Sequence, residues 1–154
     1  DSIEKERDLE FQRIRAELSN EIQNGLAEVE KEGDKVIIRL AEQGSFESGS
    51  ANLKSQFKTL LNSVGNTVSS SKGEIRIEGH TDNVPVIANA KFKSNWDLSG
   101  ARAGSVADYL IDSSNIKQGR ISVQGFAETK PIQSNDSASG RSKNRRIEII
   151  VDNK

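Results

Sequence analysis

The 154-residue chain contains no cysteine and no methionine, and it has one histidine, His80, and two prolines. The absence of cysteine excludes disulfides, thiolate metal sites and cysteine nucleophiles. A lone imidazole offers little for a catalytic triad or a zinc site, and neither an H-E-x-x-H nor a G-x-S-x-G motif is present. No apolar run approaches the roughly 18–20 residues of a membrane span, and no signal-peptide pattern is found. We therefore expect no enzymatic activity, no cofactor and no metal.

The missing methionine and the charge distribution describe how the chain is organised. Because a primary translation product begins with Met, we expect this chain, which begins at Asp1, to be a piece of a longer protein. Residues 1–32 hold ten acidic and five basic side chains, whereas residues 33–154 hold thirteen and seventeen. This contrast predicts an N-terminal linker over 1–33 and one domain over 34–154. The basic excess of the second segment is too small and scattered for a nucleic-acid partner.

The N-terminal half predicts a long helix, a strand and a second helix. Apolar residues recur at helical spacing over 4–31, in a narrow stripe suited to one neighbour or to a two-stranded coil. Residues 35–40 (KVIIRL) predict a strand, and Ser50 is a plausible N-cap for a helix over 51–64.

Two segments of the C-terminal half resemble each other at an offset of 46 residues. Each has an alternating strand, a Gly (Gly79 or Gly125) where the backbone can turn freely, an acid and then a Pro. A helix over 98–112 follows the first unit, whereas a helical turn near 138–143 and a strand over 146–151 follow the second. The pattern predicts an α/β (α+β) fold in two layers, with a four-stranded mixed sheet and helices on one face.

Two charged residues stand out as binding candidates. Arg102 falls inside the apolar stripe of the 98–112 helix, where a guanidinium requires an acceptor, and Asp82 lies in a loop just past a strand end. Together they would suit a zwitterion, with Asp82 taking an ammonium and Arg102 a carboxylate. Purely structural alternatives are an Asx turn at Asp82, and an internal pair of Arg102 with an acid or its snorkelling to the surface. The acids considered for that pair are Asp82, Asp97 and Glu128.

The remaining candidates have mainly structural interpretations. We expect His80 to be a packed or hydrogen-bonded residue behind the loop, and Trp96 to be a core or staple residue rather than a sugar-stacking platform. The basic cluster Arg141, Lys143, Arg145 and Arg146 is either a solvated strand entry or a small anion site.

Four ordered motifs resemble the OmpA-like peptidoglycan-binding domains over roughly residues 34–152. They are GHTD (79–82), LSxxRAxxV (98–106), the strand end QGF (124–126) and NRRIE (144–148). TDNVPV (81–86) and NWDLS (95–99) resemble the MotB-type flagellar stator B subunits in particular, and the match looks closest to the sodium-driven PomB type.

The resemblance implies binding of a diaminopimelate-containing peptidoglycan stem by Asp82 and Arg102. Thr81, Asn83 and Leu98 would line the site, and Arg146 and Asn144 are carried over from the NRR motif.

The resemblance also implies the setting of this domain. It would be the periplasmic, dimeric part of a single-pass inner-membrane protein that fixes the motor to the cell wall. The stator A subunit would be a partner of the membrane segment, and flagellar ring proteins are candidate partners at Ile87–Ser94. The linker over 1–33 would be compact in the idle stator and extended when the domain reaches the wall. The alternatives are a Pal-like envelope-tethering protein outside the motor and a cell-wall amidase or peptidase.

Overall fold

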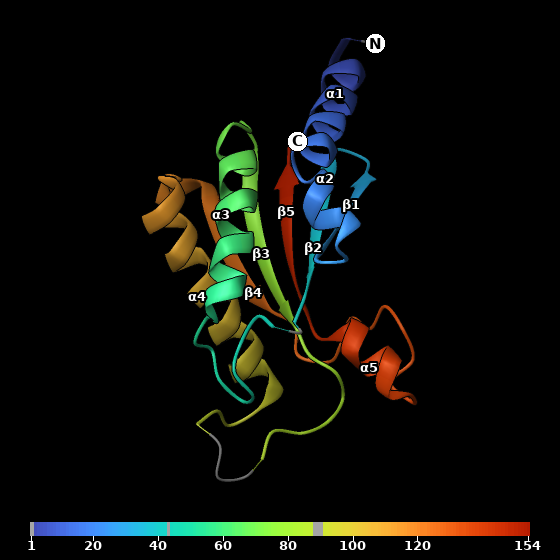
Figure 1. Ribbon diagram of the computed structural model, residues 1–154, viewed down its shortest axis with the longest axis vertical. Helices are drawn as coiled ribbons and strands as arrows, with labels where there is room; N and C mark the ends of the chain where they lie inside the picture. Colours follow the sequence, from blue (N-terminus) through green and yellow to red (C-terminus); the bar gives the residue numbers. More distant parts are fainter. Residues whose placement is uncertain (1, 43, 88–90) are drawn as a thin grey trace.

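The computed structural model describes residues 2–42, 44–87 and 91–154, which form a five-stranded sheet with helices packed on one face (Figure 1). The elements in chain order are α1 (Ser2–Glu17), α2 (Ser19–Gln23), β1 (Ala27–Glu32), β2 (Lys35–Ala41), α3 (Ser55–Ser69), β3 (Glu74–His80), α4 (Asn95–Ser114), the 3-10 turn η1 (Gln118–Arg120), β4 (Ile121–Gly125), α5 (Ala138–Asn144) and β5 (Arg146–Asp152).

The sheet has the order β1-β2-β5-β3-β4, and only the β3–β4 pair is parallel. Alternate side chains of β2, β3 and β5 are buried beneath α3 and α4, including Ile38, Ile77 and Ile149, which are fully buried. The predicted mixed sheet with helices on one face is confirmed, although it has five strands where four were expected.

The additional strand is β1, which replaces the last part of the expected 4–31 helix. The chain turns at Gly25 and Gly33, both with positive φ, and β1 pairs antiparallel with β2 from Ala27↔Leu40 to Glu32↔Lys35. Only two residues separate the paired ends, and Gly33-Asp34 is a recognised hairpin sequence. The helical prediction fails here because the apolar pattern of so short a segment fits both a helix and an alternating strand.

The helix α1 packs on the sheet domain instead of standing apart from it. Ile14 is fully buried, as is Leu18 just after the helix, and both belong to the main core. The Arg7 guanidinium forms an ion pair with Asp34, and Arg13 donates to the carbonyl oxygen of Thr67 at 3.1 Å. The N-terminal segment therefore adds to the same core as β2 and α3.

The helix α3 begins four residues later than predicted. Lys54 precedes it, and the hydroxyl of Ser50 accepts a hydrogen bond from the backbone N–H of Asn52 rather than capping a helix. Between them, Leu53 forms an isolated antiparallel β-bridge with Phe46. This displacement matters because it leaves the Ser50 carbonyl free to face α4.

The repeated glycines Gly79 and Gly125 allow helix α4 to approach the sheet closely. A Cβ on Gly79 would lie 2.1 Å from the carbonyl oxygen of Ser99, and one on Gly125 would lie 2.5 Å from the backbone nitrogen of Gly100. Neither glycine has positive φ, so the expectation that they serve as free turning points is wrong. Their function is steric, because any side chain would push α4 off the strand ends.

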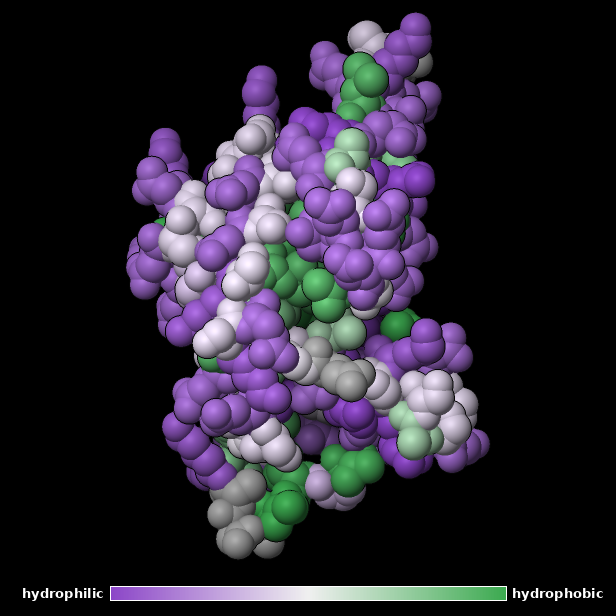
Figure 2. Space-filling view, in the orientation of Figure 1, coloured by the Kyte–Doolittle hydropathy of each residue, from purple (hydrophilic) through white to green (hydrophobic). Residues whose placement is uncertain are grey.

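The face of the molecule shown in Figure 2 is largely hydrophilic. Hydrophobic side chains gather on the loop at the bottom of that view, where Val84 and Ile87 are 54% and 73% exposed. Part of the Ile87–Ser94 stretch, residues 88–90, lies outside the described residues. Among those that are described, no helix has both the length and the apolar character needed to cross a membrane.

Candidate functional site

Four segments meet at one end of the sheet because of the strand directions. Strand β5 is antiparallel to both β2 and β3, and its first residue, Arg146, pairs with Ala41 and His80 at the last positions of those strands. Glu42 directly follows Ala41, Arg145 directly precedes Arg146, and Asp82 lies two residues after His80. The N-terminal part of α4 lies on the same end, over Gly79.

These segments surround a cleft of about 520 Å³. Its described lining combines the charged side chains of Glu42, Lys54, Asp82, Arg102 and Arg145 with the apolar side chains of Phe46, Val84, Val86, Ile87, Phe92 and Leu98. A cleft with convergent charges of both signs on an apolar wall has the character of a small-ligand site.

Arg102 is held in this cleft from several sides. Its Nε donates to the carbonyl oxygen of Ser50 at 2.8 Å, one terminal nitrogen to Glu42 Oε1 at 3.2 Å and the other to the carbonyl oxygen of Glu47 at 3.4 Å. The guanidinium carbon lies 4.7 Å from the centre of the Phe46 ring. Burial lowers the pKa of Arg102, with the Glu42 charge opposing and the Arg145 charge adding to this effect, but an arginine remains a cation.

The internal partner of Arg102 is therefore Glu42, and none of the three acids considered from the sequence contacts it. Asp97 instead accepts a hydrogen bond from the backbone N–H of Lys93 at 3.0 Å, next to the α4 N-cap. Glu128 is exposed on the turn after β4. Arg102 is only 6% exposed, which excludes snorkelling.

Asp82 makes both the local turn and a long-range ion pair. Its Oδ1 accepts from the backbone N–H of Val84 at 2.9 Å, as in an Asx turn, and its Oδ2 accepts from Arg145 at 2.7 Å. Arg145 also donates to Glu42 Oε2 at 2.9 Å. The result is one ionic chain, Asp82–Arg145–Glu42–Arg102. Although burial lowers the pKa of Arg145, its hydrogen bonds to Asp82 and Glu42 outweigh this, and the net shift is upward.

The structure brings most of the predicted site residues together. Thr81, Asp82, Leu98 and Arg102 line the cleft, and Asn83 is exposed directly beside Asp82. Arg146 instead donates to Glu148 and to the carbonyl oxygens of Asn144 and Lys130.

Sequence reasoning missed Glu42, and it named Arg145 only within the basic cluster while choosing Arg146 from the NRR motif as the site residue. Arg146, Glu148 and Ile150 line the open face of the sheet. Because side chains alternate along a strand, Arg145, the residue before Arg146, is expected to point toward the opposite face. The alternation of side chains along β5 could therefore have identified Arg145 as a residue of the cleft. No local pattern marks Glu42, which lies 60 residues before its partner.

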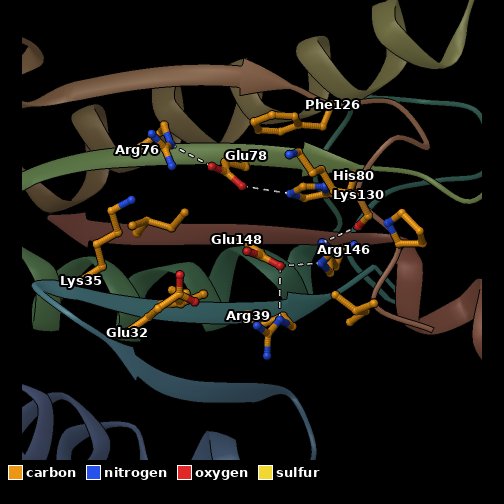
Figure 3. Close-up of a pocket in the computed structure, with 14 residues that line it drawn as sticks. Glu32, Lys35, Arg39, Arg76, Glu78, His80, Phe126, Lys130, Arg146 and Glu148 are labelled. Atoms are coloured by element: carbon orange, nitrogen blue, oxygen red, sulfur yellow. Dashed lines mark hydrogen bonds and ion pairs between the residues drawn. The ribbon is translucent and has the colours of Figure 1, made fainter.

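The open sheet face carries a second group of buried charges (Figure 3). Glu78 contacts Arg76 at 2.7 Å and His80 Nε2 at 3.1 Å, while Glu148 contacts Arg146 at 2.5 Å and Arg39 at 3.2 Å. Donor atoms of Glu78, His80 and Glu148 lie within 4.8 Å of one another, as in a cation site. However, a divalent cation would have to displace three guanidiniums that already neutralise the two carboxylates, and we assign no metal to this group.

His80 and Trp96 differ in how they meet the sequence expectations. His80 is 5% exposed and stacks on the Phe126 ring at a centroid distance of 5.1 Å, which confirms a packed, hydrogen-bonded histidine behind the loop. Trp96 is 55% exposed, so the prediction of a core or staple residue is wrong. It lies on the first turn of α4, where the neighbouring Asn95 and Leu98 supply the buried contacts instead.

Comparisons with known proteins agree with this architecture. The sequence profile of the OmpA family matches residues 45–145. Motility protein B of Bacillus subtilis (strain 168) is 36% identical over 125 residues, which make up 80% of this chain and 48% of that protein. The chain thus spans about half the length of this curated relative.

Two solved structures are also similar to this chain. The cell wall anchor of the T6SS from Pseudomonas aeruginosa has a TM-score of 0.83 and 33% identity, and the match covers 92% of this chain and 98% of that one. The periplasmic domain of Helicobacter pylori MotB (residues 78-256) has a TM-score of 0.74 and 25% identity, covering 83% of each chain.

Proposed function

Because this chain belongs to the OmpA family, we propose that it is a non-catalytic domain that binds peptidoglycan and anchors a larger assembly to the cell wall. The observation that carries this proposal is the cleft at the sheet end, where Asp82 and Arg102 are both less than 10% exposed and lie in one lining. The relatives whose names mention a cell wall anchor and a periplasmic MotB domain support the location as well as the function.

The chemistry of the cleft fits the zwitterionic end of a diaminopimelate unit in the stem peptide. Asp82 would accept the ammonium group, and Arg102 would donate two N–H groups to the carboxylate. Leu98 and Phe46 supply an apolar wall for the methylene chain between the charged ends. Thr81 and Asn83 flank Asp82, so they are positioned to complete the contacts around the ammonium.

The assembly we propose is the flagellar motor stator. The 36% identity to a motility protein over 80% of this chain supports a MotB-type role, with the domain holding the stator so that torque acts on the rotor. This role places the domain in the periplasm, as a homodimer, below an inner-membrane segment that meets the stator A subunit. Contact with flagellar ring proteins at Ile87–Ser94 and sodium as the coupling ion, as in PomB, are further parts of this proposal.

A second candidate is an anchor outside the flagellar motor. The match to the T6SS cell wall anchor covers 92% of this chain at 33% identity. The two candidates share the wall-binding step and differ in the machine that is held. Deleting the gene of the full protein should abolish swimming if it serves the motor, whereas a secretion defect with normal swimming would favour the second candidate.

Sedimentation with purified peptidoglycan sacculi tests the binding step. We expect Asp82→Asn and Arg102→Ala to reduce binding by about thirtyfold or more, since losing one half of a buried charged contact costs about 2–5 kcal/mol. Asp108→Asn, which changes an exposed carboxylate on α4, is the matched control and should bind like wild type. Equal binding by all four proteins would refute the site, and release of soluble fragments from sacculi would show an enzyme instead.

A further inference from the structure

Within the described cleft, both carboxylates already have cationic partners. Glu42 gives one oxygen to Arg102 at 3.2 Å and the other to Arg145 at 2.9 Å, so its carboxylate bridges the two guanidiniums. Asp82 gives one oxygen to Arg145 and the other to a backbone N–H. A ligand that enters this cleft must therefore rearrange existing ion pairs rather than fill empty ones.

Glu42 is the carboxylate of this chain that can leave more readily. Its side chain is 19% exposed, compared with 9% for Asp82, the other carboxylate of the chain. Arg102 would stay in place without it, because the carbonyls of Ser50 and Glu47 and the ring of Phe46 hold the guanidinium independently. The space between Arg102 and Arg145 is thus a preformed carboxylate position that the protein fills with its own side chain.

We propose that Glu42 occupies the position of the ligand carboxylate and thereby makes the cleft select zwitterions over simple anions. This inference rests on the proposed function, and it adds a specificity-determining residue to the pair Asp82 and Arg102. The ligand class is an amino-acid head group that carries an ammonium and a carboxylate on neighbouring atoms.

The selection follows from the charge that each ligand leaves behind. A simple dicarboxylate that displaces Glu42 from Arg102 leaves a half-buried carboxylate with fewer partners, and it brings a further negative charge beside Asp82. A zwitterion brings an ammonium that satisfies Asp82 and the displaced Glu42, so the charges in the cleft remain balanced. Glu42 therefore opposes the binding of a simple dicarboxylate much more than the binding of a zwitterion.

The test compares meso-diaminopimelate with pimelate, which has the same seven-carbon dicarboxylate chain without the two amines. Calorimetric or NMR titrations use wild type, Glu42→Gln and, as matched control, Glu128→Gln on the exposed turn after β4. We expect Glu42→Gln to bind pimelate about tenfold more tightly than wild type, because one charge-assisted internal hydrogen bond no longer competes. Its affinity for diaminopimelate should change by less, and the control should keep the wild-type ratio.

An affinity of Glu42→Gln for pimelate no higher than that of wild type overturns the inference. If wild type sediments with sacculi in that case, the proposed function stands and only the role of Glu42 is wrong. If wild type binds neither sacculi nor diaminopimelate, both fail together. Should Glu42→Gln not fold by circular dichroism, Glu42→Asp gives the same readout, because its shorter side chain cannot bridge both guanidiniums and it should raise pimelate affinity about threefold.

Discussion

At the residue scale, the contact between α4 and the sheet depends on the absence of two side chains. Gly79 lies at the end of β3, beneath the carbonyl group of Ser99, and this contact sets the position of Arg102 one turn further along the helix. The same strand continues into the loop of Asp82. A single glycine therefore influences how both halves of the proposed site are placed.

We predict that Gly79→Ala destabilises the protein by about 2 kcal/mol, because the new Cβ would overlap a backbone carbonyl that cannot move independently of the helix. Gly104→Ala is the matched control, since a Cβ there meets nothing within 4 Å and alanine favours the helix interior, so it should be neutral or stabilising by about 0.5 kcal/mol. Urea unfolding of the three proteins measures the difference. Equal midpoints for wild type and Gly79→Ala would contradict the steric explanation.

At the element scale, α1 is attached to the domain by a few side chains near its C-terminal end and by polar contacts along its length. Ile14 is fully buried, whereas Ile3 and Leu9 are 54% and 68% exposed. Asn153 at the C-terminus donates to Glu10 at 2.8 Å. In Figure 1 the N-terminal turns of α1 extend beyond the end of the sheet. Such limited apolar burial is typical of an element that opens at a low free-energy cost.

We predict that locking α1 to the domain blocks function without disturbing the fold, since the linker would have to extend for the domain to reach the wall. Cysteines introduced as Glu10→Cys and Asn153→Cys would be the only thiols of this chain and can be joined by a short bismaleimide. In the full-length protein, complete crosslinking should stop swimming, while thermal unfolding of the purified domain should shift upward or stay unchanged.

Each single-cysteine variant treated with the same reagent is the control for this experiment. Normal swimming under complete crosslinking would show that α1 stays docked during function. A loss of swimming in the single-cysteine controls would instead point to damage by the reagent.

At the scale of the whole molecule, pH acts on stability through the charges buried on the open sheet face. Burial alone would raise the pKa of Glu148, but the hydrogen bond and charge of Arg146, together with the charges of His80 and Arg39, lower it below its ordinary value of 4.5. A carboxylate with a lowered pKa stabilises the fold above its unfolded pKa, and this contribution is lost as the pH falls through the lower, folded value.

We predict that Glu148→Gln lowers the free energy of unfolding by about 3 kcal/mol at neutral pH, because the buried Arg146 loses its counter-charge. This difference from wild type should shrink as the pH falls below 4.5, where the wild-type carboxylate also becomes neutral. Glu74→Gln, at the exposed start of β3, is the control and should follow the wild-type curve. A difference that stays constant from neutral to acid pH would show that charge is not the cause.

Much of the fold was predictable because it depends on local patterns. The apolar runs of β2 and β5, the alternating apolar residues of β3 and β4, and the helical stripe of α4 are legible in the sequence, since each element must bury at least one face. The hairpin of β1 was missed, although its two-residue Gly33-Asp34 turn was visible, because the preceding helical spacing masked a short strand. The late start of α3 was not predictable from an isolated serine that resembles a cap.

The sequence alone determined that Asp82 follows a strand and that Arg102 occupies an apolar helix face, because both facts depend on neighbours a few residues away. Only the tertiary structure decided which charges meet. Arg102 pairs with Glu42 across 60 residues, and Asp82 pairs with Arg145 across 63, because antiparallel β5 brings the ends of β2 and β3 to its own beginning. Strand order and direction are set by the burial of the whole sheet, and no short stretch of sequence contains that information.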